Sequence, residues 1–311
     1  LPEIPIDPLF FGIPPKSLAA IETAQLLTLE STRLALADAG YQKRDFDRSR
    51  TAVFIGTGAG EGDLGQQYSF RAMLPHFFGE SAASILSGLD GQVPDWNGDV
   101  FTGIIMNITA GRVADRFNLG GANVTIDAAC ASALAALRAG ILELKAGECD
   151  MVIAGGADTL MSPYAYTCFS KVGALSASGR SCPFDVGADG IVLGEGIGTV
   201  ILKRLADAEK DGDRIDAVIK GMGASSDGKG RGLTVPKPEG QAAALSRAYA
   251  NAGVDPESVT LIEAHGTGTA AGDSAEAAAL NRFFAQTRMP AKTCAVGSVK
   301  SMIGHTKCAA G

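Results

Sequence analysis

The chain has 311 residues, of which 46% are hydrophobic and 20% charged, so it is long enough for one large domain or two ordinary ones and too apolar to be disordered. Its net charge of −7 and isoelectric point of about 5.1 argue against nucleic acid as the main partner, because phosphate binding needs a concentrated basic surface. No apolar run reaches the length of a membrane span, and residues 1–15 lack the basic and apolar regions of a signal peptide. These features predict a soluble, cytoplasmic, globular protein.

The first predicted element is a helix over 17–39, which has leucines and alanines at helical spacing, Ser17 as its N-cap and Gly40 as its stop. A short apolar strand over 51–56 follows, and residues 75–98 are expected to be irregular because Gly, Pro and Asp are frequent there. Further helices are predicted over 100–117, 130–146, 238–252 and 273–285. Further strands are predicted over 123–127, 149–158, 197–205, 214–223, 259–266 and 294–298.

The strand 123–127, the helix after it and the strand 149–158 form a βαβ unit, which predicts an α/β protein with a parallel sheet. These strands are continuous apolar runs, which is typical of strands buried on both faces, so helices are expected on each side of the sheet. The passage that begins at residue 123 resembles the one that begins at residue 258. Both run from a strand through a small-residue turn into a helix, which suggests a duplication of about 150 residues.

Cys130 lies where a predicted strand meets an alanine-rich helix, in the stretch TIDAACASALAALRAGILEL. A sulfur at a helix N-terminus lies near unpaired backbone N–H groups and the positive end of the helix dipole, which favours the thiolate. The small neighbouring residues leave room for a substrate to reach it. The other five cysteines lack this placement and are expected to be small buried hydrophobic residues. No CxxC pair occurs and the chain has only three histidines, so a zinc site is not expected. A disulfide framework is not expected either, because the chain is long and shows no secretion signal.

Two of the three histidines also lie at strand ends beside glycines. His265 lies in EAHGTGTAAGD, at the carboxyl edge of a predicted strand, where sites collect in parallel sheets. Thr267 and Thr269 in the same loop are suited to hydrogen-bond a ligand that carries amides. Lys300 and His305 share GSVKSMIGHT, and a lysine near two histidines would keep them neutral or orient them.

Three other motifs are incomplete. GEGDLG fits a dinucleotide-binding pattern, but its two carboxylates would repel a pyrophosphate. GASSDGKG lacks the hydroxyl that holds magnesium in a P-loop, and the residues after it do not predict the required helix. HGTG resembles an esterase oxyanion loop, but no G-x-S-x-G elbow occurs in the chain.

The chain resembles the β-ketoacyl synthases in the order and spacing of three motifs, which are DAACASAL with Cys130, EAHGTGT with His265, and GSVKSMIGHT with Lys300 and His305. The stretch 176–205 also resembles that family, so the similarity covers nearly the whole chain. Residues 96–121 are most similar to ketosynthase domains of large iterative type I synthases. Polyunsaturated fatty acid synthases and enediyne-type polyketide synthases are the nearest of these.

The resemblance implies the thiolase fold, with five layers in the order α-β-α-β-α built from two duplicated halves, and usually a homodimer. It places the N-terminal half at 1–210 and the C-terminal half at 211–311. Both halves are expected to be incomplete, because the family's first strand and its late Gly-Phe-Gly segment are absent. We therefore expect the segment expressed alone to be poorly folded and inactive, and a cooperative melt with measurable condensation would contradict this.

The resemblance further implies a decarboxylative Claisen condensation in fatty acid or polyketide chain elongation. Cys130 would take the acyl chain as a thioester, and malonyl carried on the phosphopantetheine arm of an acyl carrier protein would then bind. His265 and His305 would polarise the malonyl thioester carbonyl, with Lys300 supporting them, and Thr267 and Thr269 would bind the pantetheine. No metal and no redox cofactor is expected, and the partners would be the carrier protein and the other domains of a multifunctional enzyme.

Two alternatives remain open at this point. A thiolase-like acyltransferase would work without decarboxylation, although thiolases use a second cysteine in place of one histidine. A chain-length-factor-like partner would be non-catalytic, although such partners lose the nucleophile. The chain length of the product, its class and the carrier-protein dock are not predicted. The basic run 42–50 is a candidate dock, but such runs are commonly solvated loops.

Overall fold

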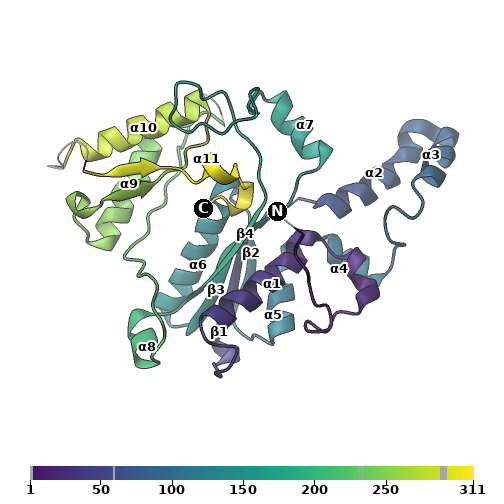
Figure 1. Ribbon diagram of the computed structural model, residues 1–311, viewed down its shortest axis with the longest axis horizontal. Coiled ribbons are helices and arrows are strands. Elements are labelled where there is room, and N and C mark those ends of the chain that lie inside the picture. Colours follow the sequence, from purple (N-terminus) through teal and green to yellow (C-terminus); the bar gives the residue numbers. More distant parts are fainter. Residues whose placement is uncertain (1–2, 59, 231, 233, 288–292) are drawn as a thin grey trace. The chain divides into compact units, whose positions relative to one another are not determined.

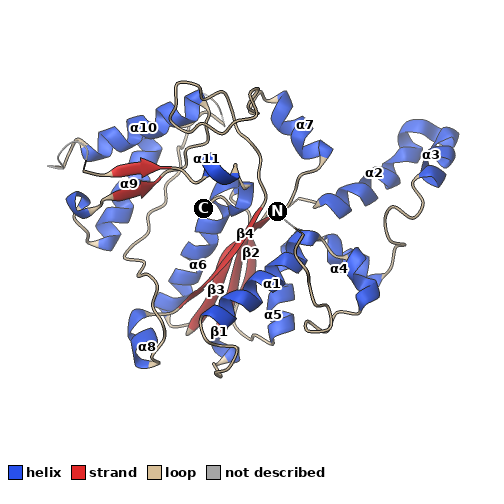
Figure 2. Cartoon of the chain, in the orientation of Figure 1, coloured by secondary structure: helices blue, strands red, loops and turns tan. Residues whose placement is uncertain are grey.

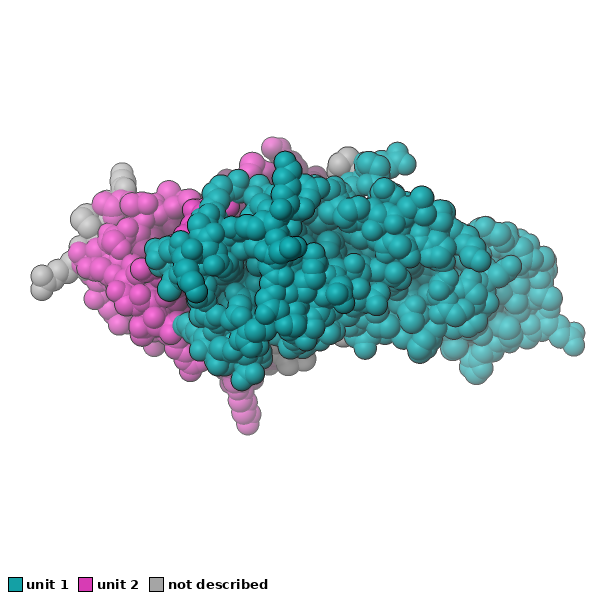
Figure 3. Space-filling view, turned by 90° about the horizontal axis from the view of Figure 1, so that it is seen from below, with its two compact units in different colours: residues 1–162, 195–214, 306–311 teal, residues 163–194, 215–305 magenta. Residues whose placement is uncertain are grey.

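The computed structural model describes residues 3–58, 60–230, 232, 234–287 and 293–311, which fall into two compact units. Unit 1 comprises residues 1–162, 195–214 and 306–311, and unit 2 comprises residues 163–194 and 215–305 (Figure 3). Both units draw on separate stretches of the chain, so neither is a simple N-terminal or C-terminal half.

Unit 1 is built on a four-stranded sheet with the strand order β2-β1-β3-β4 (Figure 2). Its strands are β1 Thr51–Gly56, β2 Asn123–Ile126, β3 Met151–Asp158 and β4 Gly196–Leu202. β1 pairs in parallel with both β2 and β3, which confirms the predicted parallel βαβ arrangement, whereas β4 runs antiparallel to β3. The helices of unit 1 are α1 Thr23–Asp38, α2 Asp63–Phe78, α3 Ala82–Gly88, α4 Gly98–Ile104, α5 Thr109–Phe117, α6 Ser132–Ala146 and α8 Leu205–Lys210.

Helices cover both faces of this sheet, as the continuous apolar strands predicted (Figure 1). Val53, Ile55 and Ile153 point to one face, where they pack against α1 and α5. Phe54 and Val152 alternate with them and point to the other face, where they pack against α6. Every residue of β1 and β3 is buried, while β2 and β4 form the partly exposed edges of the sheet. The core of unit 1 therefore lies on both sides of the two central strands.

Gly155 marks the closest approach of β4 to β3. A Cβ atom there would overlap the carbonyl oxygen of Gly198 and lie 2.8 Å from Cα of Thr199. We expect Gly155→Ala to lower the free energy of unfolding by about 3 kcal/mol or more, because backbone atoms of a buried sheet cannot move aside. Gly198→Ala is the matched control, since its Cβ would meet nothing within 4 Å. Equal urea midpoints for the two variants would contradict this expectation.

The helix predicted over 17–39 begins later than expected. The backbone of Ile21 is extended, so a short 3-10 helix that contains Ser17 precedes α1. The prediction that Ser17 is the N-cap is wrong, because its hydroxyl donates instead to the carboxylate of Asp99 at 2.6 Å. The stop at Gly40 is confirmed by its left-handed backbone, with φ of 82°.

Two other predictions fail around α2 to α5. The segment 75–98 is not irregular throughout, because α2 runs on through Pro75 in its last turn and α3 follows. The helix predicted over 100–117 is broken at Ile105, whose backbone is extended. The side-chain amide of buried Gln25 donates to the carbonyls of Gly103 and Ile105, at 2.8 and 3.1 Å, which satisfies acceptors that the helix end leaves open.

Unit 2 contains a two-stranded parallel sheet of β5 and β6. Its elements are α7 Pro163–Lys171, α9 Pro238–Ala252, β5 Leu261–Glu263, α10 Ala270–Phe284, β6 Ala295–Gly297 and α11 Lys300–Ile303. The strand predicted over 214–223 is not formed among the described residues. This segment instead runs along α9, where the N–H of Met222 donates to the side chain of Asn251 at 3.0 Å. Among the described residues, no helix of either unit is long and apolar enough to cross a membrane.

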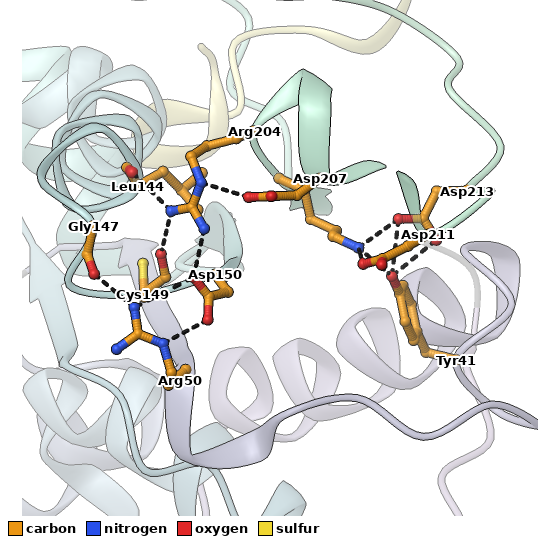
Figure 4. Close-up of polar contacts among 11 residues, drawn as sticks. Tyr41, Arg50, Leu144, Gly147, Cys149, Asp150, Arg204, Asp207, Asp211 and Asp213 are labelled. Carbon is orange, nitrogen blue, oxygen red and sulfur yellow. Dashed lines mark hydrogen bonds and ion pairs between the residues drawn. The ribbon is translucent and has the colours of Figure 1, made fainter. Parts of the chain in front are cut away.

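Ion pairs tie the end of β4 to the rest of unit 1 (Figure 4). The carboxylate of Asp150 accepts hydrogen bonds from Arg50 and Arg204, each at 2.5 Å, and these bonds lower the pKa of Asp150 to about 2. The ammonium of Lys203 donates to Asp213 at 2.6 Å. It also donates to Asp211 and to the hydroxyl of Tyr41. Charge in this region is thus compensated within the unit.

The basic run 42–50 takes part in this network. Arg44 pairs with the carboxylate of Asp213, and Arg50 pairs with that of Asp150. Two of its cationic side chains are therefore engaged within unit 1, which favours an ordinary structural role for the run over a dock for an acidic carrier protein.

Glu22 is a buried carboxyl group that caps α2 from outside the helix. Its side chain is 4% exposed and accepts the N–H of Gly65 at 2.8 Å. Burial, and to a smaller extent the charge of Asp63, raise the pKa of Glu22 to about 7, although the bonds from the backbone N–H groups oppose the shift. The folded unit therefore retains this proton at a pH where the unfolded chain has released it.

We expect Glu22→Gln to be more stable than the wild type by about 1–2 kcal/mol at pH 8, and little different at pH 4.5. The wild type loses stability as the pH rises from the ordinary glutamate value to about 7, because the unfolded state releases the proton first. A glutamine does not ionise and carries no such loss. Urea unfolding at both pH values checks this, with the exposed Glu80→Gln as control. A difference that does not change with pH would contradict it.

Candidate active site

Cys130 lies in unit 1, at the carboxyl edge of the sheet. It follows β2 in a 3-10 turn, Ala129–Ala131, and its side chain is exposed. The helix predicted over 130–146 begins two residues later, at Ser132, with the 3-10 turn leading directly into it. The prediction that Cys130 lies where a strand meets a helix N-terminus is confirmed.

The other predicted site residues all lie in unit 2. The rings of His265 and His305 are neighbours, with centroids 5.4 Å apart and planes at 83°. His265 follows β5, and His305 follows α11 after Gly304. Two residues 40 positions apart in the chain thus come together, edge to face, within one unit.

One carboxylate and one hydroxyl form hydrogen bonds with the backbone of the His265 loop. The carboxylate of Glu276 in α10 accepts the backbone N–H groups of His265 and Gly266, at 2.7 and 2.8 Å. The hydroxyl of Ser298 donates to the carbonyls of the same two residues, at 3.3 and 3.2 Å. Neither Glu276 nor Ser298 was predicted from the sequence. The only signal for Glu276 was an acidic side chain in the second turn of the helix after the histidine loop.

The environment of His265 favours the neutral imidazole. Loss of solvent around the ring lowers the pKa of His265 below its usual value of 6.5, and the charge of Lys300 lowers it further. The carboxylates of Glu276 and Asp273 oppose the shift, with smaller effects. Lys300 itself is only 3% exposed. The charge of Lys300 thus acts on His265 in the direction of the neutral imidazole, which can donate one N–H at pH 7.

His305 is held by its backbone. Its N–H donates to the carbonyl of Val192 at 2.7 Å, and its carbonyl accepts the N–H of Gly194 at 3.0 Å. The preceding Gly304 has φ of 73°, and a Cβ there would lie 2.8 Å from the carbonyl oxygen of Val192. A glycine is required before the histidine for both reasons.

Thr267 and Thr269 lie together in the loop after His265. Their hydroxyl oxygens are 2.9 Å apart, and that of Thr269 also accepts the N–H of Gly272 and so caps α10. Thr269 therefore has a structural role besides any contact with a ligand. Each hydroxyl keeps some capacity for hydrogen bonds, because it has one proton and two lone pairs.

Two family models match the chain. The model described as the β-ketoacyl synthase N-terminal domain matches residues 3–208, and the one described as the β-ketoacyl synthase C-terminal domain matches residues 216–311. The chain belongs to the β-ketoacyl synthase family.

Curated relatives and solved structures show which members of this family the chain resembles. One relative, a component of the phenolphthiocerol/phthiocerol polyketide synthase of Mycobacterium tuberculosis, is 40% identical over 312 residues, which are 100% of this chain and 15% of that protein. Another, a component of the polyunsaturated fatty acid synthase of Thraustochytrium, is 38% identical over 324 residues, which are 100% of this chain and 11% of that protein. The chain thus spans only a small part of the curated relatives that it matches.

The ketosynthase from module 6 of the bacillaene synthase of Bacillus subtilis 168 matches the structure with a TM-score of 0.83 and 35% identity. The match covers 98% of this chain and 48% of that one. The oxazolomycin ketosynthase domain of Streptomyces albus JA3453 matches with a TM-score of 0.82 and 32% identity, over 98% of this chain and 50% of that one. The chain therefore has the thiolase-like fold of the ketosynthase domains that it matches.

Proposed function

We propose that this ketosynthase domain transfers an acyl chain to Cys130 and condenses it with malonyl carried by an acyl carrier protein. The main support is the pair of imidazoles in unit 2, since His265 and His305 lie edge to face with the charge of Lys300 acting on His265. Cys130, at the carboxyl edge of the unit 1 sheet, supplies the nucleophile. The proposal requires Cys130 and the two histidines to meet at one cavity.

In the first half-reaction, the thiolate of Cys130 attacks the carbonyl carbon of the incoming acyl thioester. A carbon–sulfur bond to Cys130 forms, and the bond from the carbonyl carbon to the pantetheine sulfur breaks. The pantetheine leaves as a thiolate, which takes up the proton that the Cys130 thiol released when it ionised. The backbone N–H of Cys130 would be one donor to the oxyanion that develops on the carbonyl. The covalent intermediate divides one difficult condensation into two easier steps.

In the second half-reaction, malonyl thioester replaces the released thiol. N–H groups of His265 and His305 donate to its thioester oxygen, and this stabilises the enolate that forms as the bond to the carboxylate breaks and CO₂ leaves. The enolate carbon attacks the acyl carbonyl on Cys130, and the cysteine sulfur is released as the 3-oxoacyl product forms. Thr267 and Thr269 would hold the pantetheine amides in place during these steps.

The proposed partners follow from this chemistry. They are an acyl carrier protein with its phosphopantetheine arm, a second copy of the chain in a homodimer, and the other domains of a cytoplasmic multidomain synthase. The proposed functional halves are residues 1–210, which carry the nucleophile, and residues 211–311, which carry the histidines.

The test is a two-stage incubation of the protein. An acyl-pantetheine thioester is added first, and intact mass with peptide mapping should locate one acyl group on Cys130. Malonyl-pantetheine is added next, and the adduct should disappear as CO₂ and a 3-oxoacyl thioester appear. Turnover of the adduct without CO₂ release would instead indicate a thiolase-like acyltransferase. The absence of any adduct in a preparation that thermal melting shows to be cooperatively folded would contradict the proposal and indicate a non-catalytic partner.

A further inference from the structure

The turn that carries Cys130 is closed by one buried hydroxyl group. Ser132 is fully buried, and its hydroxyl donates to the carbonyl of Ala129 at 2.7 Å. The same oxygen accepts the N–H of Ala128 at 2.8 Å. One side chain thus bonds the two residues that precede Cys130, and these bonds fix the direction in which the backbone enters residue 130.

The turn needs such support because its backbone is strained. Ala129 has φ of 50°, a left-handed conformation that residues with a Cβ seldom adopt. The carboxylate of Asp127 accepts the N–H of Ala129 at 2.9 Å, so both backbone polar groups of the strained residue have side-chain partners. A strained conformation persists only when the surrounding contacts enforce it.

The backbone of Ser132 itself has no room to shift. Gly56, at the end of β1, packs directly on it, since a Cβ on Gly56 would overlap the carbonyl carbon of Ser132 and lie 2.5 Å from its oxygen. Strand β1, one of the two central strands, therefore sets the position of the Ser132 backbone. The hydrogen bonds of the Ser132 hydroxyl then hold the turn relative to that strand.

A buried thiol, that of Cys308, also interacts with this hydroxyl. Cys308 is in hydrogen-bonding contact with the side chains of both Ser132 and Asp158, and its N–H donates to the carboxylate of Asp158 at 3.2 Å. The ammonium of Lys307 lies 3.0 Å from the same carboxylate. Burial, and then the charge of Asp158, raise the pKa of Cys308 to about 12, so this thiol stays protonated and acts as a neutral support.

We propose that Ser132, supported by Cys308, is a positioning residue that sets the orientation and reactivity of Cys130. The inference rests on the proposed function, in which Cys130 is the nucleophile. Ser132 makes no contact with substrate in this role and acts through the backbone of the turn. Its hydroxyl, rather than its bulk, is the essential group.

The test compares Ser132→Ala, Ser132→Thr and Ser246→Ala. Ser246 is the matched control because its hydroxyl also donates to a helix carbonyl, that of Ala242 at 2.9 Å, but lies far along the chain in α9. Two rates are measured by intact mass, which are acylation of Cys130 by an acyl-pantetheine thioester and its alkylation by iodoacetamide from pH 5.5 to 9.5. Thermal melting gives the folded fraction for each variant.

We expect Ser132→Ala to slow acylation about tenfold to a hundredfold per folded molecule, and to shift the pH profile of alkylation. Ser132→Thr keeps the hydroxyl and should recover most of the loss, whereas Ser246→Ala should match the wild type. A wild-type rate and pH profile in folded Ser132→Ala would overturn the proposal, even if its melting temperature fell. If the wild type forms no adduct on Cys130, the proposed function fails, and the alkylation profile still decides the role of Ser132.

Discussion

The Cys130→Ala variant is expected to form no acyl adduct and no condensation product, because a methyl group cannot carry a thioester. The loss should be complete within detection rather than partial, since no second nucleophile is proposed for the acyl chain. Intact mass after incubation with an acyl-pantetheine thioester measures the adduct, and mass spectrometry of the released thioesters measures the product.

Cys168→Ala is the matched control for this experiment. Cys168 is also an exposed cysteine, but it lies on α7 and has no place in the proposed chemistry. It should be acylated and condense like the wild type. An adduct that persists in Cys130→Ala and disappears in Cys168→Ala would show that Cys168, and not Cys130, is the nucleophile.

The central part of the fold could be predicted from the sequence because its signals are local and strong. Apart from Thr51 at the start of β1 and Asp158 at the end of β3, these strands have no polar residues that would mark an exposed face, and both are buried throughout. The position of Cys130 also followed from local patterns, because a strand, a small-residue turn and an alanine-rich helix occur in immediate succession. His265, and Lys300 with His305, were predicted as site residues in the same way, because they are chemistry-bearing residues beside glycines.

The predictions that failed depend on contacts between distant residues. Ser17 has the chemistry of an N-cap, but Asp99 competes for its hydroxyl. The helix expected over 100–117 breaks where the amide of Gln25 satisfies the carbonyl of Ile105. The strand expected over 214–223 has the right propensity, but a strand also needs a partner, and no sequence pattern names that partner.

The supporting residues of the site were missed for the same reason. Glu276 lies 11 positions beyond the histidine whose N–H it accepts, and nothing in its helix distinguishes it from a surface acid. Ser132 reads as an ordinary small residue near the start of a helix. Its importance follows only from the strained Ala129 and the close approach of Gly56. Local sequence thus indicated the reactive groups but not the groups that hold them.

The His265→Ala variant is expected to lower the rate of condensation by about 10²–10³-fold, because it removes one donor to the developing enolate. Acylation of Cys130 should persist, since that step does not use the enolate donors. A two-stage assay separates the effects, with the adduct measured before malonyl-pantetheine is added and CO₂ release measured afterwards. The matched control is His76→Ala, which removes the third histidine, in the last turn of α2, and should leave both stages unchanged.

The pH profile gives this prediction a second and independent test. Solvent loss and the charge of Lys300 lower the pKa of His265, so the imidazole is neutral at pH 7 and gains a proton only under more acidic conditions. The wild-type condensation rate should therefore show no contribution from His265 ionisation between pH 7 and 8. In Lys300→Met, the repulsion from the ammonium is gone, so the pKa of His265 should rise and the acidic limb of the profile should move to higher pH. If the pH profile of Lys300→Met matches that of the wild type, the charge of Lys300 does not control the pKa of His265. If His265→Ala releases CO₂ at the wild-type rate, the imidazole of His265 has no part in the condensation.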